Sequence, residues 1–280
     1  MRSVGAEDTG SSLEDMGCGI MKVAVSGKGG VGKTTLTAAM ALIVARQGKK
    51  VLAVDADPDA NLASALGIPE SKQNDIITIA RQKSLIEERT GAKLKEYGQM
   101  FKLNPEVSDI ADRFAYQHNG VSLLMLGAVE GGGTGCACPE NTLLRALVQD
   151  IVLNRNEVLL LDMEAGIEHL GRATARGVDC LVVVVEPGLR SVDSVRRIAR
   201  MAGEIGIRDI RLVMNRVRSV DDERYIANEL PGYSIIGAIP YSEKLIAADR
   251  DGVSVLDAID DDLLRRFEDI AARLEQVRPA

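Results

Sequence analysis

The sequence predicts an α/β fold in which a largely parallel β-sheet is flanked by helices. Short apolar runs alternate along the chain with longer stretches of helix-forming residues. Most of these runs are continuously apolar, as strands buried on both faces of a parallel sheet are. Hydrophobic residues make up 46% of the 280 residues and charged residues 27%, which argues against global disorder.

Seven apolar runs are predicted to be strands, and the segments between them supply the helices. In chain order the strands are Lys22–Ser26, Val51–Asp55, Val121–Leu126, Glu157–Asp162, Cys180–Glu186, Ile210–Asn215 and Ser234–Ile239. The predicted helices are Thr34–Gln47, Asn141–Leu153, Ser191–Gly203, Asp221–Glu229 and Asp260–Val277. The last of these has one apolar face, so we expect it to dock on the domain as a C-terminal helix.

The chain is expected to form one domain, residues 21–280, behind a disordered tail. Residues 1–20 are small, polar and acidic, and they lack the basic and apolar regions of a secretory signal. A segment from about 69 to 119 breaks the alternation and is rich in charged helix formers without a clear strand. We therefore predict a helical excursion there, at one edge of the domain.

Composition also limits the partners and the compartment. No run of 18 or more apolar residues is present, so no transmembrane helix is expected. The net charge of −7 argues against a broad nucleic-acid-binding surface. Only 4 cysteines occur, too few for a disulfide framework. We expect a cytoplasmic protein that binds neither membrane nor nucleic acid.

A glycine-rich loop follows the first predicted strand and precedes the first helix. Its sequence, GKGGVGKTT from Gly27 to Thr35, fits the phosphate-loop pattern G-x-x-x-x-G-K-[ST] in the required strand–loop–helix context. Backbone N–H groups of such a loop cradle phosphate oxygens at the positive end of a helix. Lysine places a charge on the β- and γ-phosphates, and the next hydroxyl binds Mg²⁺. The candidate ATP-binding residues are Gly29, Gly30, Val31, Gly32, Lys33, Thr34 and Thr35, with Thr34 as the Mg²⁺ ligand.

The additional lysine in this loop, Lys28, makes the pattern more specific. The sequence GKGGVGKTT resembles the deviant Walker A loop of the P-loop NTPases of the SIMIBI class, which include nitrogenase iron protein and the MinD and ParA ATPases. The resemblance implies a homodimer in which Lys28 crosses the interface to the nucleotide of the partner. Lys28 and Lys33 are therefore candidate catalytic residues. A solvent-exposed loop lysine is the alternative for Lys28.

Two carboxylates and two later residues complete the candidate nucleotide site. Asp162 ends an apolar run in the form of a Walker B motif, although an aspartate at a strand end also caps helices. The resemblance implies that Asp57 orients the attacking water and that Met163–Gly166 forms a switch. Asn215 and Pro240 each follow a predicted strand, and the resemblance implies contacts with adenine. Many strands end in such residues, so this last signal is weak.

The pair Cys136 and Cys138 lies in the loop GGGTGCACPEN before a predicted helix. Four interpretations compete: a disulfide, two buried structural cysteines, a catalytic cysteine and a metal site. A C-x-C disulfide would be strained and out of place in the cytosol, this loop is not apolar, and His118 and His169 are the only histidines for a catalytic pair. Thiolates bind soft or borderline metals, and a twofold dimer would supply four of them. These arguments favour a metal site.

The cysteine loop, together with DADPDANL, DMEAGIEHLGR and VVVVEPGLRSVDS, resembles the CooC type of nickel-insertion accessory ATPase over most of residues 21–280. This resemblance implies that Cys136 and Cys138 bind nickel, or zinc in vitro, at the dimer interface. It also implies carbon monoxide dehydrogenase as the client. The alternatives are an iron–sulfur ATPase of the nitrogenase iron protein type and a MinD- or ParA-like positioning ATPase. The former needs two well-separated cysteines, and Cys180 looks like a core thiol instead.

Overall fold

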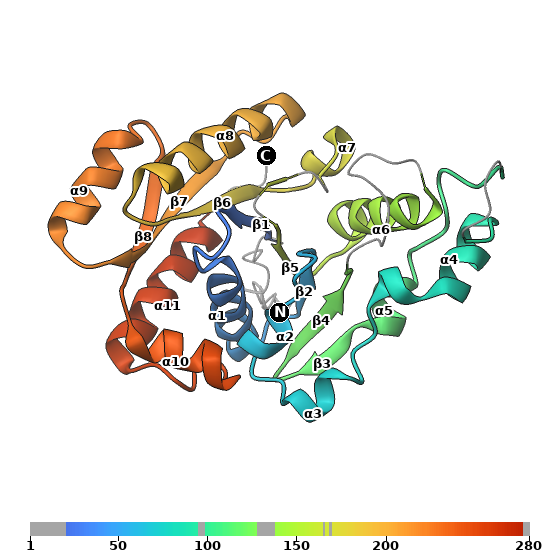
Figure 1. Ribbon diagram of the computed structural model, residues 1–280, viewed down its shortest axis with the longest axis horizontal. Helices are drawn as coiled ribbons and strands as arrows, with labels where there is room; N and C mark the ends of the chain where they lie inside the picture. Colours follow the sequence, from blue (N-terminus) through green and yellow to red (C-terminus); the bar gives the residue numbers. More distant parts are fainter. Residues whose placement is uncertain (1–20, 95–98, 128–137, 165, 168–169, 277–280) are drawn as a thin grey trace, which may run out of the picture.

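A computed structural model describes residues 21–94, 99–127, 138–164, 166–167 and 170–276, and in it a single sheet lies between two layers of helices (Figure 1). Across these residues the sheet has eight strands in the order β3-β4-β2-β5-β1-β6-β7-β8. All neighbouring strands are parallel except β3 and β4. The strands are β1 (Lys22–Gly27), β2 (Val51–Asp55), β3 (Tyr116–His118), β4 (Val121–Met125), β5 (Val158–Asp162), β6 (Cys180–Val185), β7 (Ile210–Val217) and β8 (Ser234–Pro240). The predicted fold class and the seven predicted strands are confirmed.

Helices cover both faces because successive strand residues point to opposite sides of the sheet. Val23 and Val25 belong to one apolar core and Ala24 to the other. The first core is covered by α1 (Lys33–Arg46), α2 (Leu62–Ala65), α10 (Glu243–Asp251) and α11 (Asp261–Glu275). The second is covered by α4 (Lys83–Thr90), α5 (Ile110–Phe114), α6 (Pro139–Asn154), α7 (Arg172–Ala175), α8 (Leu189–Ile205) and α9 (Val220–Glu229).

The C-terminal helix docks on the domain as expected. Its apolar side chains Phe267, Ile270 and Leu274 are almost fully buried in the core formed with α1. Asp260 caps the helix, since its Oδ1 accepts the N–H of Leu263 at 3.0 Å. No helix in the described part of the chain has the length and apolarity needed to cross a bilayer.

The segment from 69 to 119 contains α3 (Glu70–Gln73), the short 3₁₀ helix η1 (Ile79–Arg81), α4, α5 and the edge strand β3. The sequence analysis expected no clear strand here, and β3 is a difference. Three residues are too few to show an alternating pattern. The signal that was overlooked is the Asn119-Gly120 pair between β3 and β4, both with positive φ (47° and 80°), which is a common two-residue hairpin turn.

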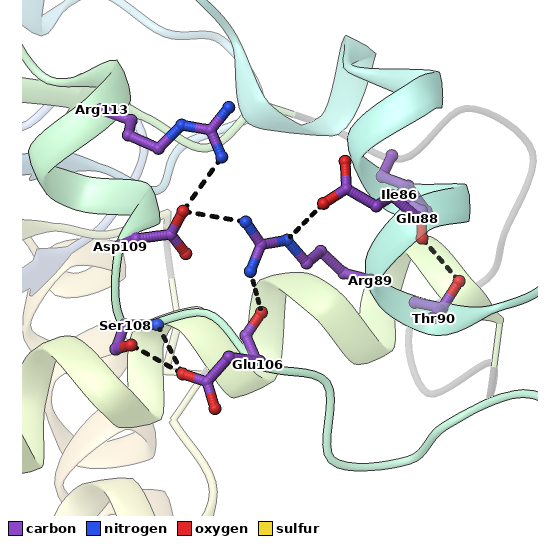
Figure 2. A network of polar contacts seen from close by, with 8 residues as sticks. All are labelled: Ile86, Glu88, Arg89, Thr90, Glu106, Ser108, Asp109 and Arg113. Atoms are coloured by element: carbon purple, nitrogen blue, oxygen red, sulfur yellow. Dashed lines mark hydrogen bonds and ion pairs between the residues drawn. The ribbon is translucent and has the colours of Figure 1, made fainter.

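A group of ionic contacts joins the end of α4 to the start of α5 (Figure 2). Arg89 Nη2 lies 2.8 Å from Asp109 Oδ2, and Arg113 Nη1 lies 3.0 Å from the same oxygen. Arg89 also donates to the carbonyl of Glu106 at 3.4 Å. Farther along, Arg155 after α6 pairs with Asp112 of α5 at 2.7 Å. The excursion is therefore tied to the C-terminal end of α6, the end opposite the cysteine pair.

Candidate active site

The carboxyl ends of the parallel strands meet at one edge of the sheet, where ligands bind in open α/β folds. A cavity of about 840 Å³ opens there. Among the predicted residues it is lined by Gly29, Gly30, Gly32, Lys33, Thr34, Thr35, Asp57, Asn215 and Pro240. Segments more than 180 residues apart in the sequence thus converge on one site. Three further predicted residues, Lys28, Val31 and Asp162, lie around it without lining it.

The phosphate loop has the backbone shape that an anion cradle needs. β1 ends at Gly27, where an added Cβ would lie 2.6 Å from the carbonyl oxygen of Val184. Gly32 has a φ of 96° and is the residue directly before α1, so the loop turns sharply into the helix. Lys33 is only 6% exposed, at the first position of α1. The N-terminus of α1 and the Lys33 ammonium both favour an anion in the cavity.

Two buried carboxylates lie at the carboxyl ends of β2 and β5. Asp55 and Asp162 are neighbours in the β2–β5 register and are 0% and 1% exposed. The pKa of Asp162 is raised from 3.8 to about 7, mainly by burial and then by the charge of Asp55, against a hydrogen bond from Thr34 and the charge of Lys33, which lower it. Burial likewise raises the pKa of Asp55 to about 6, against hydrogen bonds from Leu62 and Asp57 N–H groups.

These residues fit a magnesium ion. Mg²⁺ prefers oxygen ligands and keeps several waters. The Oδ2 atom of Asp162 is buried without a hydrogen-bond partner, so the site carries unused acceptor capacity next to Thr34. The other carboxylate oxygen, Oδ1, accepts a hydrogen bond from the Thr37 hydroxyl at 3.3 Å. A cation beside this pair would relieve the repulsion between two buried negative charges.

The carboxylate pair predicts how stability depends on pH. Both folded-state pKa values lie above the unfolded value of 3.8. The folded chain therefore binds these protons more tightly, and its stability falls as pH rises from about 4 to about 7. Asp162→Asn removes one charge and its repulsion of Asp55. We expect the nucleotide-free variant, in EDTA, to have a higher Tm than wild type at pH 8 and a flatter dependence of Tm on pH. Parallel curves for the two proteins between pH 5 and 8 would contradict this.

The cavity wall beside Pro240 contains residues that the sequence analysis missed. The guanidinium of Arg218 lies 3.9 Å from the ring centroid of Tyr241, and both line the cavity. The helix α10, which was also not predicted, contributes Leu245 and Ile246. The Ser242 cap three residues before Leu245 was the available signal, since its hydroxyl accepts the N–H of Leu245 at 3.4 Å.

Lys28 pairs within its own chain. Its Nζ lies 3.3 Å from Glu186 Oε1, and Glu186 also lies 3.4 Å from Arg216. Glu186 follows β6 and lines the cavity. The sequence analysis did not identify Glu186 as a site residue. Its position one residue after a buried strand in this sheet was one available indication, and its place in VVVVEPGLRSVDS was another.

In the expected switch segment, the N–H of Gly166 donates to the carbonyl of Glu164 at 2.6 Å, and its carbonyl accepts the Ser26 hydroxyl at 2.9 Å. This N–H is therefore used inside the chain. The resemblance to the deviant Walker A ATPases implies a contact from this N–H to the γ-phosphate, and that contact would require the hydrogen bond to Glu164 to break.

The cysteine pair is only partly described. Cys136 lies outside the described residues, whereas Cys138 is half-buried directly before α6. Its carbonyl accepts the N–H of Thr142 at 3.0 Å. The position at a helix N-terminus favours a thiolate. Cys180, in contrast, is buried in β6, and burial raises the pKa of its thiol to about 12. Among the described residues, no group of three or more His, Cys, Asp or Glu side chains is arranged to hold a metal ion.

Comparison with known proteins places this site in a family. Residues 22–255 match the CobQ/CobB/MinD/ParA nucleotide-binding domain. The chain is 42% identical over 259 residues to the carbon monoxide dehydrogenase accessory protein CooC of Rhodospirillum rubrum, a match that covers 92% of this chain and 98% of the relative. It is 26% identical to the septum site-determining protein MinD of Thermotoga maritima, over 90% and 86% of the two chains.

Solved structures agree on the fold. MinD of Pyrococcus horikoshii, complexed with Mg-ADP, aligns with a TM-score of 0.65 at 19% identity, over 92% of this chain and 97% of that structure. A MinC:MinD complex from Aquifex aeolicus aligns with the same TM-score of 0.65 at 23% identity, over 91% and 95% of the two chains. These likenesses confirm a largely parallel sheet flanked by helices.

Proposed function

The chain belongs to the CobQ/CobB/MinD/ParA family of nucleotide-binding ATPases and, within it, to the CooC type, and we propose that it is a homodimeric, cytoplasmic metallochaperone. In this proposal it hydrolyses ATP, binds nickel through Cys136 and Cys138, and assists nickel insertion into the Ni–Fe–S cluster of carbon monoxide dehydrogenase. The observation that carries the proposal is the 42% identity to a carbon monoxide dehydrogenase accessory protein across nearly its whole length. The C-x-C pair inside this ATPase supplies the metal ligands.

The nucleotide lies in the 840 Å³ cavity, with its phosphates on the loop from Gly29 to Thr35. Lys33 neutralises the β- and γ-phosphates, and Asp57 orients the attacking water. Thr34, Asp55 and Asp162 would hold Mg²⁺, the carboxylates directly or through water, and the bound ion would neutralise phosphate charge. Asn215 and Pro240 line the base end. Because Mg²⁺ and protons compete for the buried carboxylates, magnesium binding strengthens as pH rises.

The proposed dimer requires Lys28 to leave its present partner. In the single chain the Lys28 side chain is 39% exposed and pairs with Glu186. Crossing to a partner nucleotide would exchange this carboxylate for phosphate oxygens. A lysine held beside the cavity in one state and inserted across the interface in the other would make dimerisation depend on bound ATP.

Glu186→Gln should therefore favour the dimer. The variant removes the carboxylate that competes with the partner nucleotide for Lys28. Two such pairs break when the symmetric dimer forms. Because each partly exposed ion pair is worth at most about 1 kcal/mol, we expect up to about 30-fold tighter ATP-dependent self-association. Sedimentation equilibrium with ATP and Mg²⁺ measures it. Glu204→Gln, an exposed glutamate on α8, is the matched control. Weaker self-association in Glu186→Gln would show that this carboxylate supports the dimer instead.

Contacts around the start of the cysteine loop support coupling between metal and nucleotide. The N–H of Leu126 donates to the carbonyl of Asp55 at 2.9 Å, and the carbonyl of Leu126 accepts the N–H of Ala80 at 2.9 Å. Gly127 follows with a φ of 76°, and a Cβ there would overlap the Thr78 side chain. The residue before Gly127 is thus hydrogen-bonded to the backbone of Asp55, a residue of the nucleotide site. We propose that a nucleotide-dependent movement of β2 at Asp55 shifts Leu126, and with it the segment that carries Cys136 and Cys138.

The metallochaperone function is tested in cells that produce the client enzyme. Deleting this ATPase at limiting nickel should lower the nickel content of purified carbon monoxide dehydrogenase while leaving its iron content intact. Wild type should restore nickel, and Cys136→Ser/Cys138→Ser should not. Full nickel content in the deletion strain, without added nickel, would contradict the proposal.

A further inference from the structure

We propose that Asn215 is a positioning residue for the phosphate loop, beyond any contact it makes with a nucleobase. This inference rests on the proposed binding of ATP in the cavity. Asn215 lies in β7 and is 7% exposed. Its Nδ2 donates to the carbonyl of Val31 at 2.7 Å, which joins the base end of the cavity to the phosphate end.

The backbone around Asn215 is irregular, and this irregularity orients the Asn215 side chain. The β7–β8 register shifts between Met214 and Val217, so the strand departs from regular pairing at this point. Arg216 has a φ of 56°, an unfavourable value for a residue with a side chain. Asn215 Oδ1 accepts the N–H of Arg216 at 2.9 Å. One amide group therefore stabilises the unusual backbone with its oxygen and holds the phosphate loop with its nitrogen.

The hydrogen bond fixes the orientation of one peptide unit in the loop. In a trans peptide the C=O and the following N–H point in opposite directions. Pinning the Val31 carbonyl to Asn215 turns the Gly32 N–H away from Asn215, and loop N–H groups are what bind phosphate oxygens. The packing is close, because a Cβ on Gly32 would overlap Asn215 Nδ2. Asn215 thus fixes the orientation of the Val31–Gly32 peptide, and Gly32 permits this close approach because it has no side chain.

Positioning of the loop and recognition of the base can be distinguished, because they affect the binding of different ligands. An amide has two N–H donors and two acceptor lone pairs, and these bonds use one of each, so adenine contacts are compatible with the proposal. If Asn215 acted only on the base, its loss would spare ligands without a base. If it positions the loop, its loss weakens every ligand that carries the phosphates.

The experiment compares ATP with inorganic tripolyphosphate, which has no base. Asn215→Ala removes the donor to the Val31 carbonyl without placing a negative charge beside the phosphates, and Asn215→Leu keeps the side-chain size if the alanine variant folds poorly. Isothermal titration with Mg²⁺ should show both ligands weakened by a similar factor of about ten. Val213→Ala, a buried change in the same strand that does not line the cavity, controls for loss of stability and should leave tripolyphosphate affinity unchanged.

Each result has one consequence. Unchanged tripolyphosphate affinity with weaker ATP binding would overturn the proposal, since Asn215 would then act on the base alone. An equal loss in Val213→Ala would overturn it too, because the effect would be one of general stability. Wild type that binds neither ligand would refute ATP binding itself, and the assignment of Asn215 with it.

Discussion

Lys33→Ala should abolish measurable ATP hydrolysis, lowering kcat by about 100-fold or more, the usual cost of removing one preorganised charge from a transition state. The side chain is 6% exposed at the first position of α1 and lines the cavity beside the phosphate loop. Because the Lys33 side chain is almost fully buried, water screens its positive charge only weakly. Steady-state phosphate release at saturating ATP measures the effect.

The loss should not reflect unfolding. The substitution leaves the buried apolar side chains of α1, such as Leu36 and Met40, unchanged, and alanine is the best helix former. Far-ultraviolet circular dichroism and Tm should therefore stay close to wild type. Lys50→Ala, an exposed lysine just before β2, is the matched control and should hydrolyse ATP at the wild-type rate. Wild-type turnover in Lys33→Ala would refute ATP hydrolysis in this cavity.

Cys136→Ser/Cys138→Ser should weaken nickel binding by more than about 100-fold. Changes to second-shell partners of metal ligands alone cost about 10–100-fold, so the loss of both thiolates in each chain should cost more. Serine keeps the size of each side chain but is a poor ligand for a borderline metal. Anaerobic titration of nickel, with and without ATP, measures the affinity and its dependence on nucleotide.

Cys180→Ser provides the control for the cysteine experiment. Cys180 is fully buried in β6, and its raised pKa, about 12, keeps it protonated and unreactive. Nickel affinity in this variant should equal that of wild type. Equal affinity in wild type and the Cys136/Cys138 double variant would place the metal elsewhere. Affinity independent of nucleotide would refute the proposed coupling.

Much of the fold follows from local pattern. Runs such as Val51–Asp55 and Cys180–Val185 are apolar at every position, because both faces of the sheet are covered, and their strands are readily predicted. β3 is different, since its existence depends on one Asn-Gly turn and pairing with β4. α10 begins at a serine cap but has only one buried residue, Ala248, so its periodic apolar signal is weak.

The candidate site also has a part that the sequence predicts and a part that only the folded structure reveals. A contiguous loop from Gly29 to Thr35 can be recognised in sequence because its chemistry depends on neighbours in the chain. The Lys28–Glu186 pair and the Asn215–Val31 bond join residues more than 150 positions apart, and only the sheet order brings them together. The raised pKa of Asp162 likewise arises from burial and from Asp55 on a neighbouring strand. No sequence motif encodes these relations.

The most direct test of the metallochaperone account is the native mass of the protein with nickel and a non-hydrolysable ATP analogue under anaerobic conditions. We predict a dimer that carries one nickel ion, with no such species in Cys136→Ser/Cys138→Ser. Monomers that each hold a nickel ion, or a dimer whose nickel survives the double substitution, would contradict a shared C-x-C site.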